Sequence, residues 1–290
     1  MNVSPTLIKY QWHNISTMAL GAVYAFNPLK KKGFRPCVEQ LDAPADNLVD
    51  AFASWVNAPS ARYKHQVPVA LITSQAALAI IAKLTMQAPY PMLNVLNQGV
   101  RISFNAPIPR GEALHLSGEL LDASDDGYRA RVHGRVHVST SSTTNALVIE
   151  SIAAVPLKPR PKTNEAPKAR RSDWSTISRW QADANEGRRF FYLTGDFNPI
   201  HTLPLVARNT RFKGCIMHGY GSVSQIIEAL LNHGIRLSVI DLRFICPVAL
   251  PSPELLIQIA ESANDDGSWD VRLSDNAGQV YQAGYFIPAN

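Results

Sequence analysis

The chain has 290 residues, of which 46% are hydrophobic and 18% charged, so it can build a substantial apolar core. This excludes disordered, collagen-like and very small disulfide-held proteins. A net charge of +5 suggests a nucleic-acid or membrane partner only if the basic residues cluster on one folded face. The three cysteines form no CxxC pair, which is typical of a reducing compartment, and no secretory leader or membrane span is evident. We therefore expect a cytoplasmic protein.

Two long apolar segments predict buried helices. Residues 69–87 follow Pro68, a residue favoured in the first helical turn, and residues 216–231 are flanked by glycines. Both segments are apolar almost all round, which is typical of a helix wrapped by a sheet. The sequence after each segment alternates between polar and apolar residues, most clearly at 129–138, and this period of two indicates strands.

A basic, proline-rich segment separates the two halves of the sequence. Residues 156–173 contain four prolines and six basic residues but no aromatic residue, which is the composition of an extended linker. We expect an N-terminal domain over 1–157, a linker over 158–173 and a C-terminal domain over 174–290. Most of the net positive charge lies in this linker, so a nucleic-acid-binding face is not expected.

The two halves share a pattern at a constant spacing. The Phe-x-x-Pro of residues 104–107 recurs at 244–247, and the Asp-Asp-Gly of 125–127 recurs at 265–267, each 140 residues later. A tandem repeat explains two features at one offset. A long helix followed by antiparallel strands, present twice, predicts an α+β protein in which each sheet curls around its own central helix. The two sheets would then pair side by side.

The residues best suited to chemistry lie in the second half. Asp196 and His201 are separated by five positions across an Asn198-Pro199 step, and the proline disfavours a helical Asn198, so this piece is predicted to be a turn and not a helix. A turn can bring a carboxylate and an imidazole together over one cavity. Such a pair can hold and polarise a water molecule, because histidine titrates near neutral pH and the carboxylate adds a second base.

A glycine stands where the second apolar helix is expected to begin. Gly219 follows His218, and a residue without a side chain lets a carbonyl group approach the first backbone amides of a helix. Those amides and the helix dipole stabilise an oxyanion.

These residues form a pattern that resembles a known family. The run YLTGDFNPIH at 192–201, with GCIMHG at 214–219, resembles the motif of MaoC-like (R)-specific enoyl-CoA hydratases. A motif-free first half and a motif-bearing second half resemble the double hot-dog members of that family. The resemblance implies a tandem hot-dog fold and a carbon–oxygen lyase of fatty acid metabolism. The implied reaction is reversible hydration of a trans-2-enoyl thioester, carried by coenzyme A or acyl carrier protein, to the (R)-3-hydroxyacyl thioester, without cofactor or metal.

The resemblance also implies roles by position. Asp196 and His201 would be the catalytic pair, and the Gly219 N–H would receive the thioester oxygen. Tyr220 stands where the family most often has Met, and would reshape the entrance for the acyl chain. For His218 and Ser224 a purely architectural hydrogen bond is the alternative to a supporting role. The full set of substrate-binding or supporting residues is Thr194, Asn198, His218, Tyr220 and Ser224.

The first half lacks this motif in the segment before its helix, so one active site per chain is expected. In the related double hot-dog proteins the lost site gives room for a long or bulky acyl chain. Apolar residues of the first helix would line such space or simply pack the core: Val69, Leu71, Ile72, Ala76, Leu78 and Ala79.

Two other functions remain open on the same fold, a thioesterase and an acyl-thioester-binding module without turnover. The expected partner is an acyl-CoA or acyl-carrier-protein thioester, with neither nucleic acid nor membrane, and exposed sheet edges favour a homodimer.

Overall fold

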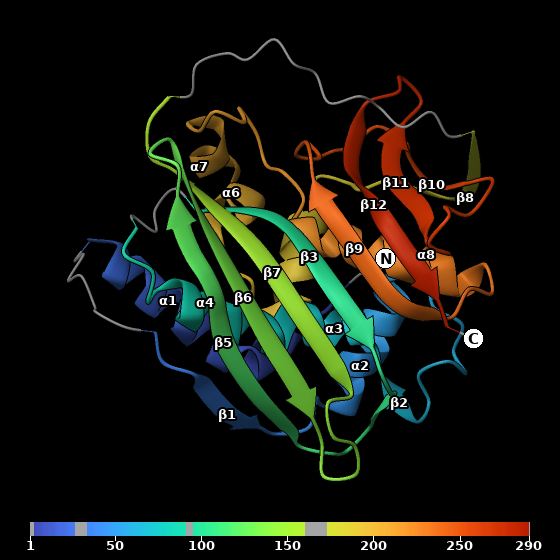
Figure 1. Ribbon diagram of the computed structural model, residues 1–290, viewed down its shortest axis with the longest axis horizontal. Coiled ribbons are helices and arrows are strands. Elements are labelled where there is room, and N and C mark those ends of the chain that lie inside the picture. Colours follow the sequence, from blue (N-terminus) through green and yellow to red (C-terminus); the bar gives the residue numbers. More distant parts are fainter. Residues whose placement is uncertain (1–2, 27–33, 91–94, 160–172, 290) are drawn as a thin grey trace.

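The computed structural model describes residues 3–26, 34–90, 95–159 and 173–289. Ten strands from both halves form one antiparallel sheet in the order β1-β5-β6-β7-β3-β9-β12-β11-β10-β8 (Figure 1). The first half supplies β1 (Cys37–Leu41), β3 (Leu96–Phe104), β5 (Leu114–Asp125), β6 (Arg129–Ser139) and β7 (Leu147–Pro156), and also a small pair, β2 (Gln66–Val67) with β4 (Ile108–Pro109). The second half supplies β8 (Trp174–Trp180), β9 (Leu237–Phe244), β10 (Leu255–Ala260), β11 (Trp269–Asp275) and β12 (Val280–Pro288).

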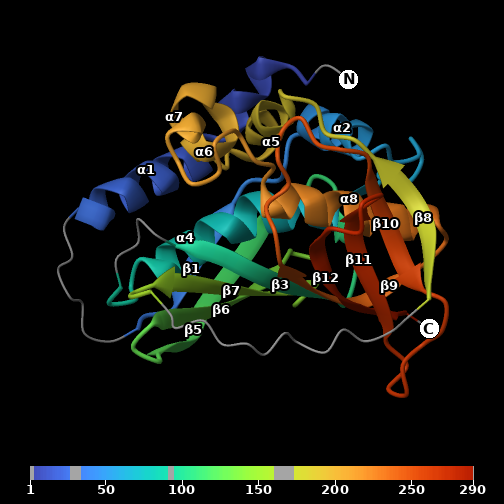
Figure 2. The same ribbon diagram turned by 90° about the horizontal axis from the view of Figure 1, so that it is seen from above.

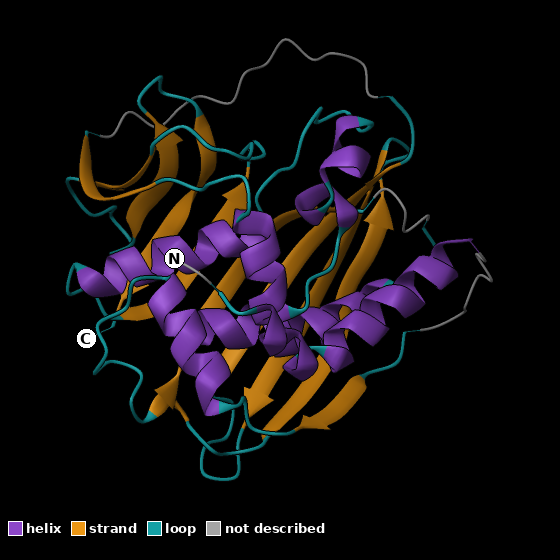
Figure 3. Cartoon of the chain, turned by 180° about the vertical axis from the view of Figure 1, so that it is seen from behind, coloured by secondary structure: helices purple, strands orange, loops and turns teal. Residues whose placement is uncertain are grey.

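The helices lie together against one face of this sheet (Figure 3). In the first half α3 (Val69–Ile72), the π-helical turn η2 (Thr73–Ala77) and α4 (Leu78–Thr85) follow one another, so the predicted first helix is confirmed with a π turn inside it. The central helix of the second half is α8 (Gly219–Asn232), buried from Tyr220 to Leu230. The other helices are η1 (Pro5–Tyr10), α1 (Trp12–Phe26), α2 (Asp46–Trp55), α5 (Glu186–Thr194), α6 (Pro199–Thr202) and α7 (Pro204–Arg208).

Helix α8 begins three residues later than the apolar run that predicts it. Ile216 forms an isolated bridge with Ala249, and the Met217 N–H donates to the Val248 carbonyl at 2.8 Å. These pairings hold residues 216 and 217 in extended conformation, so tertiary contacts override the helical preference of the run. The helix therefore starts at the predicted glycine.

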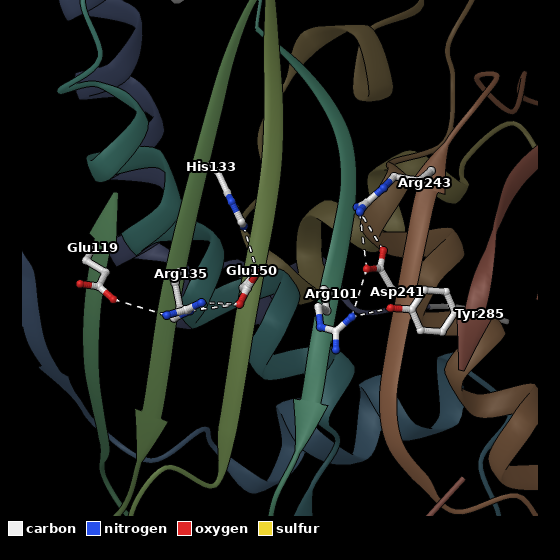
Figure 4. A network of polar contacts seen from close by, with 8 residues as sticks. All are labelled: Arg101, Glu119, His133, Arg135, Glu150, Asp241, Arg243 and Tyr285. Atoms are coloured by element: carbon white, nitrogen blue, oxygen red, sulfur yellow. Dashed lines mark hydrogen bonds and ion pairs between the residues drawn. The ribbon is translucent and has the colours of Figure 1, made fainter. Parts of the chain in front are cut away.

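Strands β3 and β9 join the two halves at a seam. Arg101 pairs with Asp241, 140 residues later, so the two positions related by the sequence repeat face each other across the seam. Their side chains form an ion pair at 3.5 Å. Arg243 also pairs with Asp241, at 3.1 Å, and Arg101 donates to the Tyr285 hydroxyl at 2.5 Å (Figure 4). The expectation that two sheets pair side by side is thus confirmed.

The alternating strand at 129–138 is also confirmed, as β6. Its apolar residues are buried and its polar side chains lie on the other face, where Glu150 accepts from Arg135 at 2.9 Å and lies 3.0 Å from His133 (Figure 4). The basic residues of this strand are therefore partly compensated by a carboxylate on β7.

The predicted linker falls mainly on residues 160–172, which lie outside the described residues. The domain boundaries drawn from it stay a prediction. All three cysteines are free thiols. None of the helices in the described ranges has the length and apolar character needed to cross a membrane.

Candidate active site

Helix α5 leads into the motif and ends just before its aspartate. Gly195 closes the helix in the left-handed region, with φ of 74°, a common helix ending for glycine. The buried Thr194 hydroxyl donates to the Phe190 carbonyl at 2.9 Å and accepts from the Asp196 N–H at 3.3 Å. His218 Nε2–H donates to the Asp196 carbonyl at 2.9 Å. The peptide groups around Asp196 are therefore held on both sides by two of the predicted supporting residues.

The histidine of the motif follows on the single turn of α6. Asn198 is extended (φ −128°, ψ 124°), and its side-chain oxygen accepts from the Ile200 N–H at 3.2 Å, so it caps this turn. The predicted turn is right for Asn198 but wrong for Pro199–Thr202. Pro199 disfavours a helix before it and starts one readily at its own position, which explains the difference.

Backbone contacts fix the imidazole of His201. Gly187 on α5 lies so close to the His201 carbonyl that a Cβ at this position would overlap it. His201 Nδ1 lies 2.8 Å from the Ile216 carbonyl, and since a carbonyl only accepts, Nδ1 carries the proton. This leaves the lone pair of Nε2 available as a base. The His218 ring lies against the His201 ring with centroids 3.9 Å apart, and Phe190 covers His218 at 4.8 Å.

Burial is the main influence on the ionisable groups of the site. Burial raises the pKa of the Asp196 carboxyl, and the charge interaction with His201 partly opposes this rise. It lowers the pKa of His201 to about 3, with His218 adding to the effect and Asp196 opposing it. It also lowers the pKa of His218 to about 3. Both imidazoles are therefore neutral near pH 7, and Asp196 keeps its proton to a higher pH than an exposed aspartate does.

The first residue of α8 completes the site. A Cβ at Gly219 would meet the Phe244 ring at 2.6 Å, so only glycine fits here without displacement. The Gly219 carbonyl accepts from Gln282 Nε2 at 2.9 Å. Amides in the first turn of a helix lack partners within the helix, and the helix dipole adds partial positive charge at this end. An oxyanion requires these properties, and the role of the Gly219 N–H stays a prediction.

A cavity of about 300 Å³ opens beside these groups. His201, Gly219 and Asn198 lie on its wall, and residues 95–98 extend the wall from the first half. Asp196 interacts with His201 but is half-buried and is not one of the residues that line the cavity. Much of the remaining wall is apolar: Ile200, Phe212, Met217, Phe244, Ile245 and Val248.

Two of the predicted residues do not reach the cavity. Tyr220 is 2% exposed, and its hydroxyl donates to Ser151 on β7 at 3.2 Å, so the expectation that it reshapes the acyl entrance is wrong. Its ring instead lies behind Phe244, with centroids 6.0 Å apart. Ser224 donates to the Tyr220 carbonyl at 2.8 Å, which is the architectural alternative considered for it.

The apolar residues of the first central helix do not line this cavity either. Leu71, Ile72, Leu78 and Ala79 are buried and Val69 packs against the core. Ala76 alone among the six borders a second cavity of about 440 Å³, beside α1 and β1.

Other wall residues carry no motif in the sequence. Ser222 lies one turn into α8, Arg211 and Phe212 precede it, and Gln282 comes from the last strand. Gln282 is 3% exposed and its Oε1 has no hydrogen-bond partner among the described residues. Only the order of the strands in the sheet brings β12 to the start of α8, so no local pattern indicates these residues. Within the described part of the chain, no group of His, Cys, Asp and Glu side chains is arranged to hold a metal ion.

The fold and the site together define a class of protein: a tandem α+β chain with one acid–base pair beside the start of a central helix. Comparison with known families supports this, since the model of the MaoC like domain matches residues 161–270. The matched residues make up most of the second half of the chain.

Individual known proteins show a similar likeness. The chain is 39% identical over 93 residues to 3-hydroxyacyl-thioester dehydratase X of Mycobacterium tuberculosis, a match that spans 31% of each protein. The crystal structure of HtdX from the same organism superposes with a TM-score of 0.70 at 20% identity, over 88% of this chain and 100% of that one.

Two further solved structures support the fold. A MaoC-like dehydratase of Phytophthora capsici superposes with a TM-score of 0.71 at 13% identity, over 91% of this chain and 98% of that one. A Mycobacterium tuberculosis protein described as having a double hotdog fold superposes with a TM-score of 0.56 at 12% identity, over 89% of this chain and 97% of that one. The predicted double hot-dog fold is thereby confirmed.

Proposed function

We propose that the chain is an enoyl-thioester hydratase and 3-hydroxyacyl-thioester dehydratase with one active site, at Asp196 and His201. The observation that carries this proposal is the His201 imidazole, which lies on the wall of the cavity with Nδ1 bound to the Ile216 carbonyl and whose pKa burial lowers to about 3. Such an imidazole can act as a base through Nε2, because the hydrogen bond at Nδ1 fixes both the tautomer and the orientation of the ring. The dehydratase name of the Mycobacterium tuberculosis relative supports the same reaction type.

In the dehydration direction the two side chains carry one proton between them: Asp196 starts protonated and His201 starts neutral with a free Nε2. His201 Nε2 removes the proton from C2 of the 3-hydroxyacyl thioester, and the Asp196 carboxyl gives its proton to the departing 3-hydroxyl group. The C2–H and C3–O bonds break, the C2=C3 double bond forms and water leaves. The raised pKa of Asp196 and the lowered pKa of His201 favour this distribution of the single proton. Hydration is the reverse sequence, and the (R) product follows from the family resemblance.

The start of α8 stabilises the charge that develops on the substrate. Loss of the C2 proton places negative charge on the thioester oxygen, and the Gly219 N–H would donate to it, since Gly219 lines the cavity at the positive end of the helix dipole. Substrate enters as a thioester of coenzyme A or of acyl carrier protein.

The test follows the loss of enoyl-thioester absorbance with enoyl-CoA substrates of increasing length, together with the chirality of the product. Asp196→Asn and His201→Ala are each expected to lower kcat by roughly 10²–10⁴-fold, because each removes one partner of the proton transfer. His233→Ala is the control, since His233 is exposed just beyond the far end of α8. Full activity in both site variants would refute the assignment.

The alternatives give distinct results in the same assay. Release of free thiol without loss of the double bond identifies a thioesterase. Saturable binding of enoyl thioesters without any turnover identifies a binding module.

A further inference from the structure

Two buried amide side chains ahead of the first strand contact the helix that leads into the motif. Gln11 follows η1 and Asn14 lies in the first turn of α1, and they are 0% and 1% exposed. Gln11 Nε2 donates to the Leu193 carbonyl at 2.7 Å, and Asn14 Nδ2 donates to the Thr194 carbonyl at 2.5 Å. These carbonyls belong to the last turn of α5, where no N–H group of the helix itself is available to donate to them. The amides therefore cap the C-terminus of α5.

The same two side chains also bind the central helix of the first half. Gln11 Oε1 accepts from Gln75 Nε2 at 2.7 Å, and Asn14 Nδ2 also donates to the Gln75 carbonyl at 2.9 Å. Gln75 lies in the π turn η2, between α3 and α4. The network therefore connects α5 to the core of the half that carries no motif.

The backbones also approach closely at this point. A Cβ at Gly195 would lie 2.8 Å from the Cβ atoms of both Gln11 and Asn14. Figure 2 shows α1 and α5 on the same side of the central helices. The glycine that ends α5 thus needs both its left-handed conformation and its missing side chain, since the N-terminal segment covers it.

We propose that Gln11 and Asn14 are positioning residues of the active site, which hold the end of α5 so that Asp196 keeps its place beside His201. Thr194 transmits the effect, because its carbonyl accepts from Asn14 while its hydroxyl accepts from the Asp196 N–H. The segment formed by η1 and α1 would then be part of the catalytic apparatus although it contributes no strand to the ten-stranded sheet. This inference rests on the proposed function for its kinetic readout.

The first test replaces Asn14 by Leu, which keeps the number and branching of the side-chain heavy atoms and removes the donor. We expect kcat to fall roughly 10- to 100-fold with KM within about 3-fold, because a small displacement of a catalytic group lowers the rate more than binding. The groups that face Asp196 are His201 on α6, together with His218 and Tyr220 at the start of α8. Water admitted by a loosened loop lowers the pKa of Asp196 and raises that of His201, so the active pH range narrows from both sides. Partial unfolding would reduce the rate without moving either limb of the profile.

A second measurement does not depend on turnover. Hydrogen exchange of the Gly195 and Asp196 amides is expected to accelerate in Asn14→Leu, while the amides of α8 keep their protection. The matched control is Thr17→Val, because Thr17 lies one turn further along α1, is 3% exposed and makes no contact with α5 among the described hydrogen bonds.

The outcomes separate the two proposals. An inactive parent protein whose Asn14→Leu variant still shows faster exchange at Asp196 refutes the proposed function and keeps the positioning contact. An active parent whose Asn14→Leu variant keeps its kcat, pH profile and exchange refutes the positioning role. Equal losses in Asn14→Leu and Thr17→Val also refute it, because they reflect general damage to α1.

Discussion

Substitution of Gly219 by Ala tests the most crowded point of the site. The added Cβ would lie 2.6, 2.9 and 3.1 Å from three carbons of the Phe244 ring, whereas ordinary contact begins at 3.4 Å. The nearest contact must open by about 0.8 Å, the difference between those distances. Tyr220 packs edge-on against the Phe244 ring, so the ring can give way only towards the cavity that it lines. The displacement is therefore shared between the start of α8 and the cavity wall, and both border the site.

A shift of this size at an oxyanion donor is expected to lower kcat roughly 10²-fold. The overlap with Phe244 lowers stability, whereas alanine is favoured over glycine in a helix by up to about 1 kcal/mol. The two effects oppose each other, so the thermal unfolding temperature should change little. The assay is enoyl-thioester hydration measured beside a thermal melt. The control is Gly214→Ala, because nothing lies within 4 Å of a Cβ at this nearby position. Parental kcat in Gly219→Ala, or an equal loss in Gly214→Ala, would refute the reasoning.

Two more predictions follow from groups around the site. On the acid side, loss of the hydration rate is expected only as pH approaches about 3, the pKa of His201, and on the alkaline side the rate is expected to decline as pH rises through the elevated pKa of Asp196. A pH–rate profile with an acid limb near pH 6.5 would contradict a neutral buried His201. Tyr220→Phe removes the bond to Ser151 and should lower the free energy of unfolding in urea by about 1 kcal/mol, with kcat within about 2-fold. A tenfold loss of activity would instead mean that Tyr220 contacts substrate.

Regular patterns predict the parts of this fold that depend on regular geometry. The period-two alternation identifies β6, and the constant offset of 140 residues anticipates that Arg101 and Asp241 occupy equivalent places. The motif likewise indicates His201 and Gly219, which the structure places on one cavity. These inferences succeed because each depends on spacing within one short segment or on a repeat.

Long-range amide contacts escape such reasoning. Asn14 binds the end of a helix 180 residues away, and neither its neighbours nor its spacing distinguishes it from a surface asparagine. Gln282 is equally unmarked, since only the strand order brings it to Gly219. The direction of the Tyr220 side chain is hidden from the sequence for a related reason, because at a helix start it depends on the neighbouring sheet, where the Tyr220 hydroxyl donates to Ser151.

The charge pair at the seam makes the two halves of the chain inequivalent as partners. In an assembly of two identical units a residue on the symmetry axis meets its own copy, so two first halves would bring Arg101 against Arg101, and two second halves Asp241 against Asp241. Like charges in such contact repel, whereas one half of each kind places a cation against an anion. The equivalent positions of the repeat therefore carry opposite charges, which suits a pairing between unlike halves. The two halves of one chain thus pair like the unlike subunits of a heterodimer. Either half alone would lack the oppositely charged strand, β3 or β9, against which the other packs.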